Sequence, residues 1–151
     1  VLDIDIILYE TIPCLKEIEI LSKLVEEYEK EVWVSFSCNK DLEFRDGSSI
    51  IKACTILSSI ENISTIGMNC FSPLIAEEAI KKLKEHSNKK ILIYPNSGEI
   101  YNNKDKDWYG EKYFDRSMIK KWLALSPDII GGCCRVGFED IKNMRKEINF
   151  L

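Results

Sequence analysis

Histidine is almost absent from this sequence, and its scarcity limits the chemistry that the chain can perform. The single histidine, His86, falls near the expected end of a helix among lysines, where a surface position is expected. Hydrolases that pair a serine or cysteine nucleophile with a histidine base need that imidazole at the site. The sequence also lacks a glycine-rich phosphate loop of the Walker or dinucleotide type. The composition therefore argues against Ser-His and Cys-His hydrolases.

Long apolar runs and an excess of positive charge are missing as well. No run approaches the ~20 residues that cross a bilayer, and the net charge of −4 suggests no general affinity for nucleic acid or anionic membranes. The first five residues include two acids and no basic segment, so no secretion signal is expected. Six cysteines without the spacing of a disulfide framework favour a reducing, cytoplasmic location. The length of 151 residues suits one domain, residues 1–151.

Short apolar runs alternate with longer amphipathic stretches along the whole chain. We expect strands at residues 4–9, 32–37, 64–69, 90–94 and 128–131. The expected helices cover residues 13–25, 50–57, 73–86, 116–125 and 138–147. The polar stretch after residue 94 is longer than most connections, and we expect a loop there. Such alternation implies parallel strands, in either a doubly wound sheet or part of a (β/α)8 barrel.

Sulfur-bearing residues gather where the expected strands end. Cys70 follows the third strand, and the adjacent pair Cys133 and Cys134 follows the fifth. The carboxyl ends of parallel strands meet at one edge, where α/β folds place their reactive groups. Three thiolates meeting there could hold Zn²⁺ and leave its fourth position open, as in a catalytic zinc site. A thiol substrate entering that position would lose its proton and become a nucleophile near neutral pH.

Other interpretations of the cysteines stay open. Free cysteines often serve as small apolar packing residues, and an adjacent pair lacks the Cys-x-x-Cys spacing familiar from zinc sites. Oxidation of the pair is a third alternative, less expected in a reducing compartment. Cys14 and Cys54 fall in expected helical stretches and are interpreted as packing residues, and Cys38 ends a strand without an obvious partner.

Two other strand ends carry polar side chains that suit a substrate. Glu10 is the first acid after the apolar run of the first strand, and its carboxylate could either pair with an ammonium group or cap the following turn. Asn96 and Glu99 lie in a polar turn beside Pro95 and Gly98. The polar side chains of such a turn either contact a ligand or only stabilise the backbone conformation of the turn.

Read in order, the strand ends resemble the homocysteine S-methyltransferase family. The resemblance covers essentially the whole chain, and five segments in family order are more specific than any one of them. These segments are Glu10-Thr11-Ile12-Pro13, Trp33-Val34-Ser35-Phe36-Ser37, Gly67-Met68-Asn69-Cys70, Tyr94-Pro95-Asn96-Ser97-Gly98-Glu99 and Gly131-Gly132-Cys133-Cys134-Arg135. The chain looks closer to the short cobalamin-independent members than to the betaine-dependent or cobalamin-dependent ones.

The resemblance implies an enzyme of the EC 2.1.1 type with a (β/α)8 TIM-barrel fold, of which this chain covers about strands four to eight. By the same resemblance, Cys70, Cys133 and Cys134 would hold Zn²⁺ and Glu10 would bind the amino group of homocysteine. Asn96 is a further candidate for substrate contact. The implied reaction moves a methyl group from S-methylmethionine or S-adenosylmethionine to the homocysteine thiol, giving methionine. No catalytic residue beyond the metal site is implied.

One part of the family pattern has no counterpart in this sequence. An N-terminal portion with an Asp-Gly-Gly-like segment is missing, and three βα units of ~30 residues or more each would be needed before Val1. We therefore expect either a fragment of a longer protein or a truncated relative, with two open sheet edges that invite self-association. Two alternatives follow: an inactive half-barrel that binds zinc or self-associates, and a barrel enzyme with Cys70 as a covalent nucleophile.

Overall fold

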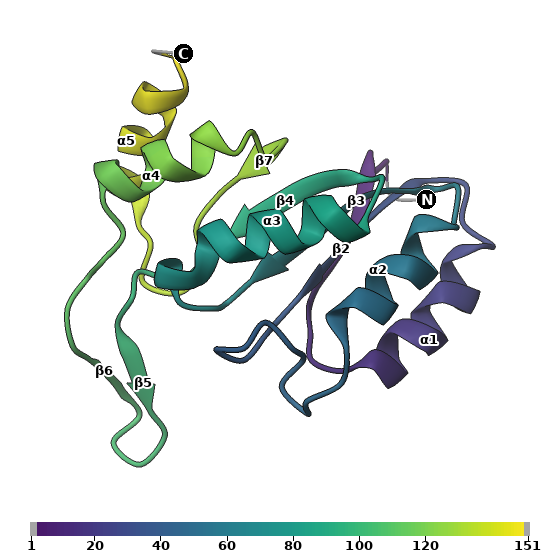
Figure 1. The fold of residues 1–151 in the computed structure, drawn as a ribbon, viewed down its shortest axis with the longest axis horizontal. Helices are drawn as coiled ribbons and strands as arrows, with labels where there is room; N and C mark the ends of the chain where they lie inside the picture. Colours follow the sequence, from purple (N-terminus) through teal and green to yellow (C-terminus); the bar gives the residue numbers. More distant parts are fainter. Residues whose placement is uncertain (1–2, 150–151) are drawn as a thin grey trace.

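A five-stranded parallel sheet, ordered β1-β2-β3-β4-β7, forms the centre of the protein (Figure 1). The computed structural model describes residues 3–149. The sheet consists of β1 (Ile6–Ile12), β2 (Glu31–Phe36), β3 (Ile63–Asn69), β4 (Lys90–Tyr94) and β7 (Ile129–Ile130). The helices are α1 (Leu15–Val25), α2 (Ile50–Ser58), α3 (Ala76–His86, after a 3-10 turn at Pro73–Ile75), α4 (Arg116–Ala124) and α5 (Phe138–Ile148).

The order of the strands decides between the two architectures that periodicity left open. Neighbouring strands of the sheet follow one another along the chain, and the order never reverses. A doubly wound sheet reverses its order at a switch point and carries helices on both faces. Here α1, α2 and α3 lie on the same face (Figure 1). The arrangement is that of an incomplete (β/α)8 barrel, and the five predicted βα units are confirmed, with most boundaries shifted by a few residues.

The hydrophobic core lies between the sheet and these helices. Every second residue of the central strands faces the helices, as Val34 and Phe36 do in β2 and Ile66 and Met68 do in β3. The helices present apolar residues at spacings of three and four, the period that places side chains on one helix face. In α1 the buried residues are Ile18, Leu21 and Val25; in α3 they are Ala76, Ala79, Ile80 and Leu83.

Gly67 allows β3 and β4 to approach each other on the opposite face of the sheet. A Cβ atom at this position would lie 2.3 Å from the carbonyl oxygen of Leu92, so any side chain would push the strands apart. The register across this pair places Gly67 opposite Leu92 and Asn69 opposite Tyr94. The glycine therefore sets the spacing of the two strands whose ends carry polar residues.

The segment after β4 is not the plain loop that its length and polarity predicted. It contains an antiparallel hairpin of β5 (Ile100–Asn102) and β6 (Asp107–Tyr109), which projects from the sheet (Figure 1). The rings of Tyr101 and Trp108 face each other across the hairpin, with centroids 5.2 Å apart. A cross-strand aromatic pair stabilises so short a ribbon, and strands of three residues are too short to show a clear alternation in the sequence.

The helices are short for a membrane-crossing role. The longest, α1, α3 and α5, have 11 residues each, whereas a bilayer takes ~20 apolar residues. Among residues 3–149 there is no helix with the length and apolar character to span a membrane.

Candidate functional site

Three cysteine side chains from distant parts of the sequence meet at the carboxyl edge of the sheet. Cys70 directly follows β3, and Cys133 and Cys134 lie in the loop between β7 and α5. The sulfur of Cys70 lies 2.7 Å from that of Cys133 and 3.6 Å from that of Cys134, and the sulfurs of the adjacent pair are 4.0 Å apart. The structure thus brings together the three cysteines that the strand-end argument singled out, all of them half-buried.

Backbone hydrogen bonds fix the loop that carries the adjacent pair. The backbone N–H of Cys133 donates to the carbonyl oxygen of Pro95 at 2.8 Å, and the N–H of Ser97 donates to the carbonyl of Cys134 at 3.0 Å. Gly132 lets the loop turn tightly, because a Cβ atom there would lie 2.1 Å from Cγ1 of Val136. The cysteine pair is therefore anchored to the segment that follows β4.

Three non-glycine residues around the cluster have left-handed backbone conformations. The φ angle is 55° at Cys70 itself, 64° at Thr11 after Glu10, and 65° at Arg135 after Cys134. This region is sparsely populated by residues with a side chain, and such strain persists where the surroundings enforce it, often at functional sites. At Arg135 one enforcing contact is visible, since its guanidinium donates to the Glu99 carboxylate at 3.2 Å.

The three thiols of the cluster differ in their pKa values. The hydrogen bond from the Cys70 thiol lowers the pKa of Cys133 to about 6, and the backbone N–H of Cys134 and the Asn69 amide act in the same direction. Donating that hydrogen bond raises the pKa of Cys70, and burial raises the pKa of Cys134. One thiolate is therefore present near neutral pH before any ligand binds.

The other three cysteines lie outside the cluster. Cys38 and Cys54 are buried in the core, and burial raises their pKa values to about 11 and about 12, so both stay protonated thiols. Cys54 packs in α2 as expected, whereas Cys14 is the residue before α1 and is only half-buried. Cys38 forms a single β-bridge with Phe44.

Asn69, which lies in the Gly67-Met68-Asn69-Cys70 segment but had no predicted role, joins the cluster to the first strand. Its side-chain nitrogen donates to Thr11 Oγ1 at 2.7 Å and lies 4.0 Å from the sulfur of Cys133. Its side-chain oxygen accepts from the Thr11 backbone N–H at 3.0 Å and from the Ser35 hydroxyl at 2.8 Å. No signal in the sequence alone marked it, because its partners depend on strand register.

Glu10 lies at the same edge of the sheet as the cluster. It is exposed, and its Oε2 lies 3.2 Å from the hydroxyl oxygen of Tyr94 at the end of β4. Tyr94 in turn lies 2.5 Å from the Ser35 hydroxyl. Glu10 is thus connected through Tyr94, Ser35 and Asn69 to the sulfur of Cys133.

Asn96 lies in the turn after β4, and its backbone N–H donates to the carbonyl of Phe71 at 2.9 Å. Its side-chain oxygen is one of two buried side-chain polar atoms in residues 3–149 that have no hydrogen-bond partner. Buried acceptors are rarely left unpaired. Asn96 lines a groove of about 1010 Å³ together with Thr11, Cys70 and Cys134.

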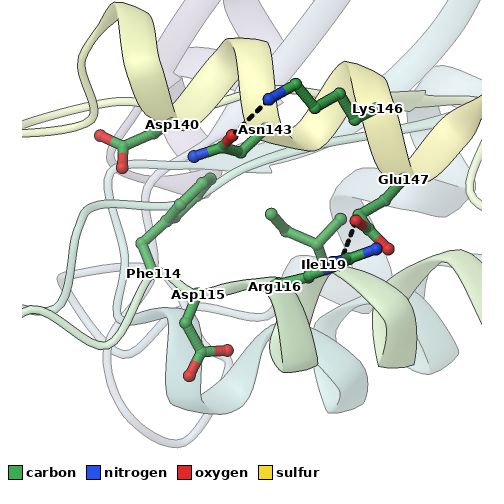
Figure 2. Close-up of a pocket in the computed structure, with 8 residues that line it drawn as sticks. All are labelled: Phe114, Asp115, Arg116, Ile119, Asp140, Asn143, Lys146 and Glu147. Carbon is green, nitrogen blue, oxygen red and sulfur yellow. Dashed lines mark hydrogen bonds and ion pairs between the residues drawn. The ribbon is translucent and has the colours of Figure 1, made fainter.

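A second hollow, of about 510 Å³, lies between α4 and α5 and shares no lining residue with this groove (Figure 2). Figure 2 shows Arg116 of α4 directed at Glu147 of α5, and the two form a close ion pair. Glu147 is buried, and Lys120 lies 3.8 Å from its other carboxylate oxygen. These contacts hold α4 against α5.

Comparison with known proteins identifies the family that the chain matches. A family model described as homocysteine S-methyltransferase matches residues 2–148. The chain is 32% identical to homocysteine S-methyltransferase 3 of Arabidopsis thaliana, over 96% of this chain and 44% of the relative. It is 33% identical to homocysteine S-methyltransferase YbgG of Bacillus subtilis, over 93% of this chain and 45% of the relative.

A solved structure matches the fold over the same extent. The metallated form of the homocysteine methyltransferase MmuM from Escherichia coli superposes with a TM-score of 0.80 at 25% identity, over 96% of this chain and 46% of that chain. The chain therefore spans less than half the length of the relatives that it matches.

Proposed function

The chain belongs to the homocysteine S-methyltransferase family, and we propose that it provides the thiol-binding part of a site that methylates homocysteine. Cys70, Cys133 and Cys134 would hold a zinc ion, Glu10 would bind the amino group of homocysteine, and Asn96 would contact the substrate. The methyl donor would be a sulfonium compound, either S-methylmethionine or S-adenosylmethionine. The product would be methionine.

The observation that supports this proposal most strongly is the convergence of the three sulfurs. They come from two loops 63 residues apart and lie within 4.8 Å of one another. A set of three thiolates suits a soft or borderline metal ion such as zinc, and three protein ligands leave one position for a substrate.

The donor set fits zinc after a small movement. Sulfur atoms bound at ~2.3 Å to one tetrahedral zinc ion lie about 3.8 Å apart. Two of the separations here, 3.6 and 4.0 Å, are close to that value, and the third, 2.7 Å, would have to open by about 1 Å. That third pair is the one in which the Cys70 thiol donates to Cys133. Loss of the shared proton, which metal binding to thiolates requires, removes the reason for this short contact.

The reaction needs few groups from the protein. When bound, the zinc ion would lower the pKa of the substrate thiol, so that the attacking sulfur carries a negative charge near neutral pH. This sulfur forms a bond to the methyl carbon of the sulfonium donor while the donor's carbon–sulfur bond breaks. The bonding electron pair stays on the leaving sulfur, which becomes a neutral thioether. No proton has to be delivered to the leaving group, which agrees with the scarcity of histidine.

The chain's own residues would orient the acceptor. The Glu10 carboxylate is exposed at the carboxyl edge of the sheet. It can therefore pair with an ammonium group without a large cost of desolvation. Asn69 donates toward Cys133 and fixes Thr11, and such contacts around metal ligands hold the ligand geometry. The groove beside Cys70 and Cys134 gives the donor a route to the acceptor sulfur.

Two alternatives to zinc-dependent methyl transfer make different predictions about mechanism and activity. A covalent mechanism with Cys70 as the nucleophile is disfavoured, because donation to Cys133 raises the pKa of Cys70. The other alternative is a metal-binding chain that self-associates without catalysis. It is favoured by exposed Ile6 and Leu8 on the edge strand β1, since parallel sheets usually have both faces covered.

The proposal is tested by assaying the zinc-loaded protein with homocysteine and each sulfonium donor while its mass is followed by size-exclusion chromatography. We expect methionine to form with one donor and to stop when a chelator removes the zinc. Turnover that survives complete removal of the metal would contradict the mechanism. Stoichiometric zinc in a self-associated chain that forms no methionine would support the non-catalytic alternative.

A further inference from the structure

The aromatic side chains of the hairpin line the same groove as the cysteine cluster. Tyr101 of β5 and Trp108 of β6 are paired across the hairpin, so their side chains lie on one face of it. Both line the groove of about 1010 Å³ that also contacts Cys70 and Cys134, and Tyr113, shortly after the hairpin, adds a third ring. The groove therefore joins an aromatic surface to the place where the proposed acceptor thiol would bind.

The base of the hairpin is anchored beside the cluster by Ser97, which is fully buried. The backbone N–H groups of Tyr113 and Phe114 both donate to the carbonyl oxygen of Ser97, at 2.8 and 3.0 Å. The N–H of Ser97 in turn donates to the carbonyl oxygen of Cys134. The chain thus leaves for the hairpin and returns from it at one point, which is tied to the loop that carries the cysteine pair.

Gly98 leaves room for the third ring at the base of the hairpin. Its φ of 109° lies in the region that favours glycine. A Cβ atom there would lie 2.6 Å from Cδ2 of Tyr113 and 2.9 Å from the backbone nitrogen of the same residue. The missing side chain therefore allows Tyr113 to pack against the turn at the wall of the groove.

In the described part of the chain, no lysine or arginine side chain covers the rings of the groove. Tyr101 is 45% exposed and Tyr113 is 40% exposed. The turn between β5 and β6 contains two lysines, yet the one cation over an aromatic ring among residues 3–149 is Lys142 over Phe138. An aromatic face attracts a cation through the quadrupole of the ring. The aromatic faces in the groove are thus open to a cation from outside the protein.

The charges in the groove suit a ligand that carries both signs. The Glu99 carboxylate lines the groove at the start of the hairpin, and hydrogen bonds from Ser97 and Arg135 hold its pKa below the usual value. Glu99 is therefore ionised at neutral pH and favours a cation nearby. Lys40 and Arg45 line the groove as well, and their positive charge suits the carboxylate of an amino acid.

We propose that Tyr101, Trp108 and Tyr113 bind the sulfonium group of the methyl donor. A sulfonium sulfur is positively charged but carries no N–H or O–H, so it cannot donate a hydrogen bond. An aromatic surface attracts such a cation, as it attracts a quaternary ammonium group. After methyl transfer the donor sulfur is a neutral thioether, and the attraction is lost. This donor site rests on the proposed function, in which a sulfonium compound delivers its methyl group to the acceptor thiol.

The test is calorimetric titration of the zinc-loaded protein, freed of excess metal, without homocysteine, so that no methyl transfer occurs. S-methylmethionine is compared with homoleucine, in which an uncharged carbon replaces the sulfonium sulfur and the shape is kept. S-adenosylmethionine is compared with S-adenosylhomocysteine, which lacks the methyl group and the charge. These two arms distinguish the two sources of a sulfonium group.

The variants are Trp108→Leu and Tyr101→Leu, with Tyr109→Leu as a matched control. Tyr109 is exposed on the same hairpin and does not line the groove. We expect the wild type to bind one sulfonium compound about 10-fold more tightly than its uncharged counterpart. Trp108→Leu should lower this ratio about 5-fold, and Tyr101→Leu by less, because tryptophan attracts cations most strongly. Tyr109→Leu should leave the ratio unchanged, and the uncharged compounds should bind all four proteins equally.

A second measurement covers the case in which a leucine variant disturbs the hairpin, as judged by thermal unfolding. Protein made with 5-fluorotryptophan keeps the shape of its rings, but fluorine weakens their attraction for a cation. The other two tryptophans, Trp33 and Trp122, do not line the groove. We expect the affinity for the sulfonium compound to fall, and the affinity for its uncharged counterpart to stay the same.

Three results would overturn the assignment of the donor site. Equal affinity for the sulfonium compounds and their uncharged counterparts would mean that the groove does not recognise the charge. An unchanged ratio in folded Trp108→Leu, or in the fluorinated protein, would mean that Trp108 does not contact the cation. Absence of binding for both sulfonium compounds would exclude the site altogether. All three leave zinc binding and thiol activation standing, whereas ring-dependent sulfonium binding without any methionine formation would contradict the proposed function instead.

Discussion

The sulfur atoms of Cys70 and Cys133 lie 2.7 Å apart although 63 residues separate them in the sequence. They meet because β3 and β7 both pair with β4, one on each side, and the three strands end at the same edge of the sheet. The backbone of Cys133 is tied to Pro95, the residue directly after β4. The strand order therefore determines the cluster, and changes that disturb β4 or its two neighbours should disturb the proposed metal binding.

Replacing Cys133 with serine should abolish zinc binding at the proposed site. The substitution takes away the sulfur that is ionised near neutral pH and contacts both other cysteines. We expect zinc affinity to fall by ~100-fold or more, since even partners of metal ligands contribute 10–100-fold. Elemental analysis after dialysis against a weak chelator measures the bound zinc. Cys14→Ser, which alters a cysteine outside the cluster, should retain stoichiometric zinc; equal loss in both variants would contradict the assignment.

Asn69→Ala should weaken the proposed zinc site without removing any of its three proposed ligands. The variant loses the donor toward Cys133 and leaves the Thr11 backbone N–H without its acceptor. We expect zinc affinity to fall ~10-fold to 100-fold and the free energy of unfolding to fall by about 2 kcal/mol. Competition with a zinc-binding dye measures the affinity. Asn143→Ala on exposed α5 is the control. Wild-type zinc affinity in Asn69→Ala would show that the amide has no part in the site.

The two adjacent cysteines should react differently with an alkylating agent when zinc has been chelated. Cys133 has a pKa lowered to about 6, whereas burial raises the pKa of Cys134. Only a thiolate is alkylated rapidly, so at pH 7 iodoacetamide should label Cys133 first. Its rate should decline as the pH falls through about 6, because the thiolate is lost below its pKa.

Peptide mass spectrometry after timed labelling distinguishes the two positions. Added zinc should suppress labelling at Cys70, Cys133 and Cys134 together, and denatured protein should show no preference between the neighbours. Equal rates for Cys133 and Cys134 in the folded protein at pH 7 would mean that the hydrogen bond from Cys70 does not lower the pKa of Cys133.

Gly67→Ala should destabilise the sheet. The added methyl group would lie 2.3 Å from the carbonyl oxygen of Leu92, a backbone atom that cannot move without shifting β4. We expect the free energy of unfolding to fall by about 3 kcal/mol, measured by urea denaturation. Gly137→Ala is the matched control, since its Cβ would meet nothing closer than 3.9 Å and its φ is −108°. A loss below about 1 kcal/mol at Gly67 would show that the strands can separate easily.

The sequence predicted the order of the elements from short-range periodicity, and it predicted the convergence of the cysteines because parallel strands end at one edge of a sheet. Strand β4 was predicted at its observed bounds, whereas β1 begins two residues later than expected, since Ile4 and Asp5 follow the same apolar alternation. The hairpin of β5 and β6 was missed, because three-residue strands carry little periodic signal. The contacts that connect Glu10 to Asn69 could not be derived either. They depend on the register that places Asn69 opposite Tyr94 and Ser35 opposite Gly67.

X-ray absorption at the zinc edge of the zinc-loaded protein tests the three-sulfur site most directly. We expect three sulfur scatterers at ~2.3 Å and one lighter atom in the resting protein, and a fourth sulfur when homocysteine is added. Cys134→Ser should reduce the resting count to two. A shell dominated by nitrogen or oxygen, or a sulfur count unaffected by homocysteine, would contradict the proposal that Cys70, Cys133 and Cys134 hold the metal that activates the substrate thiol.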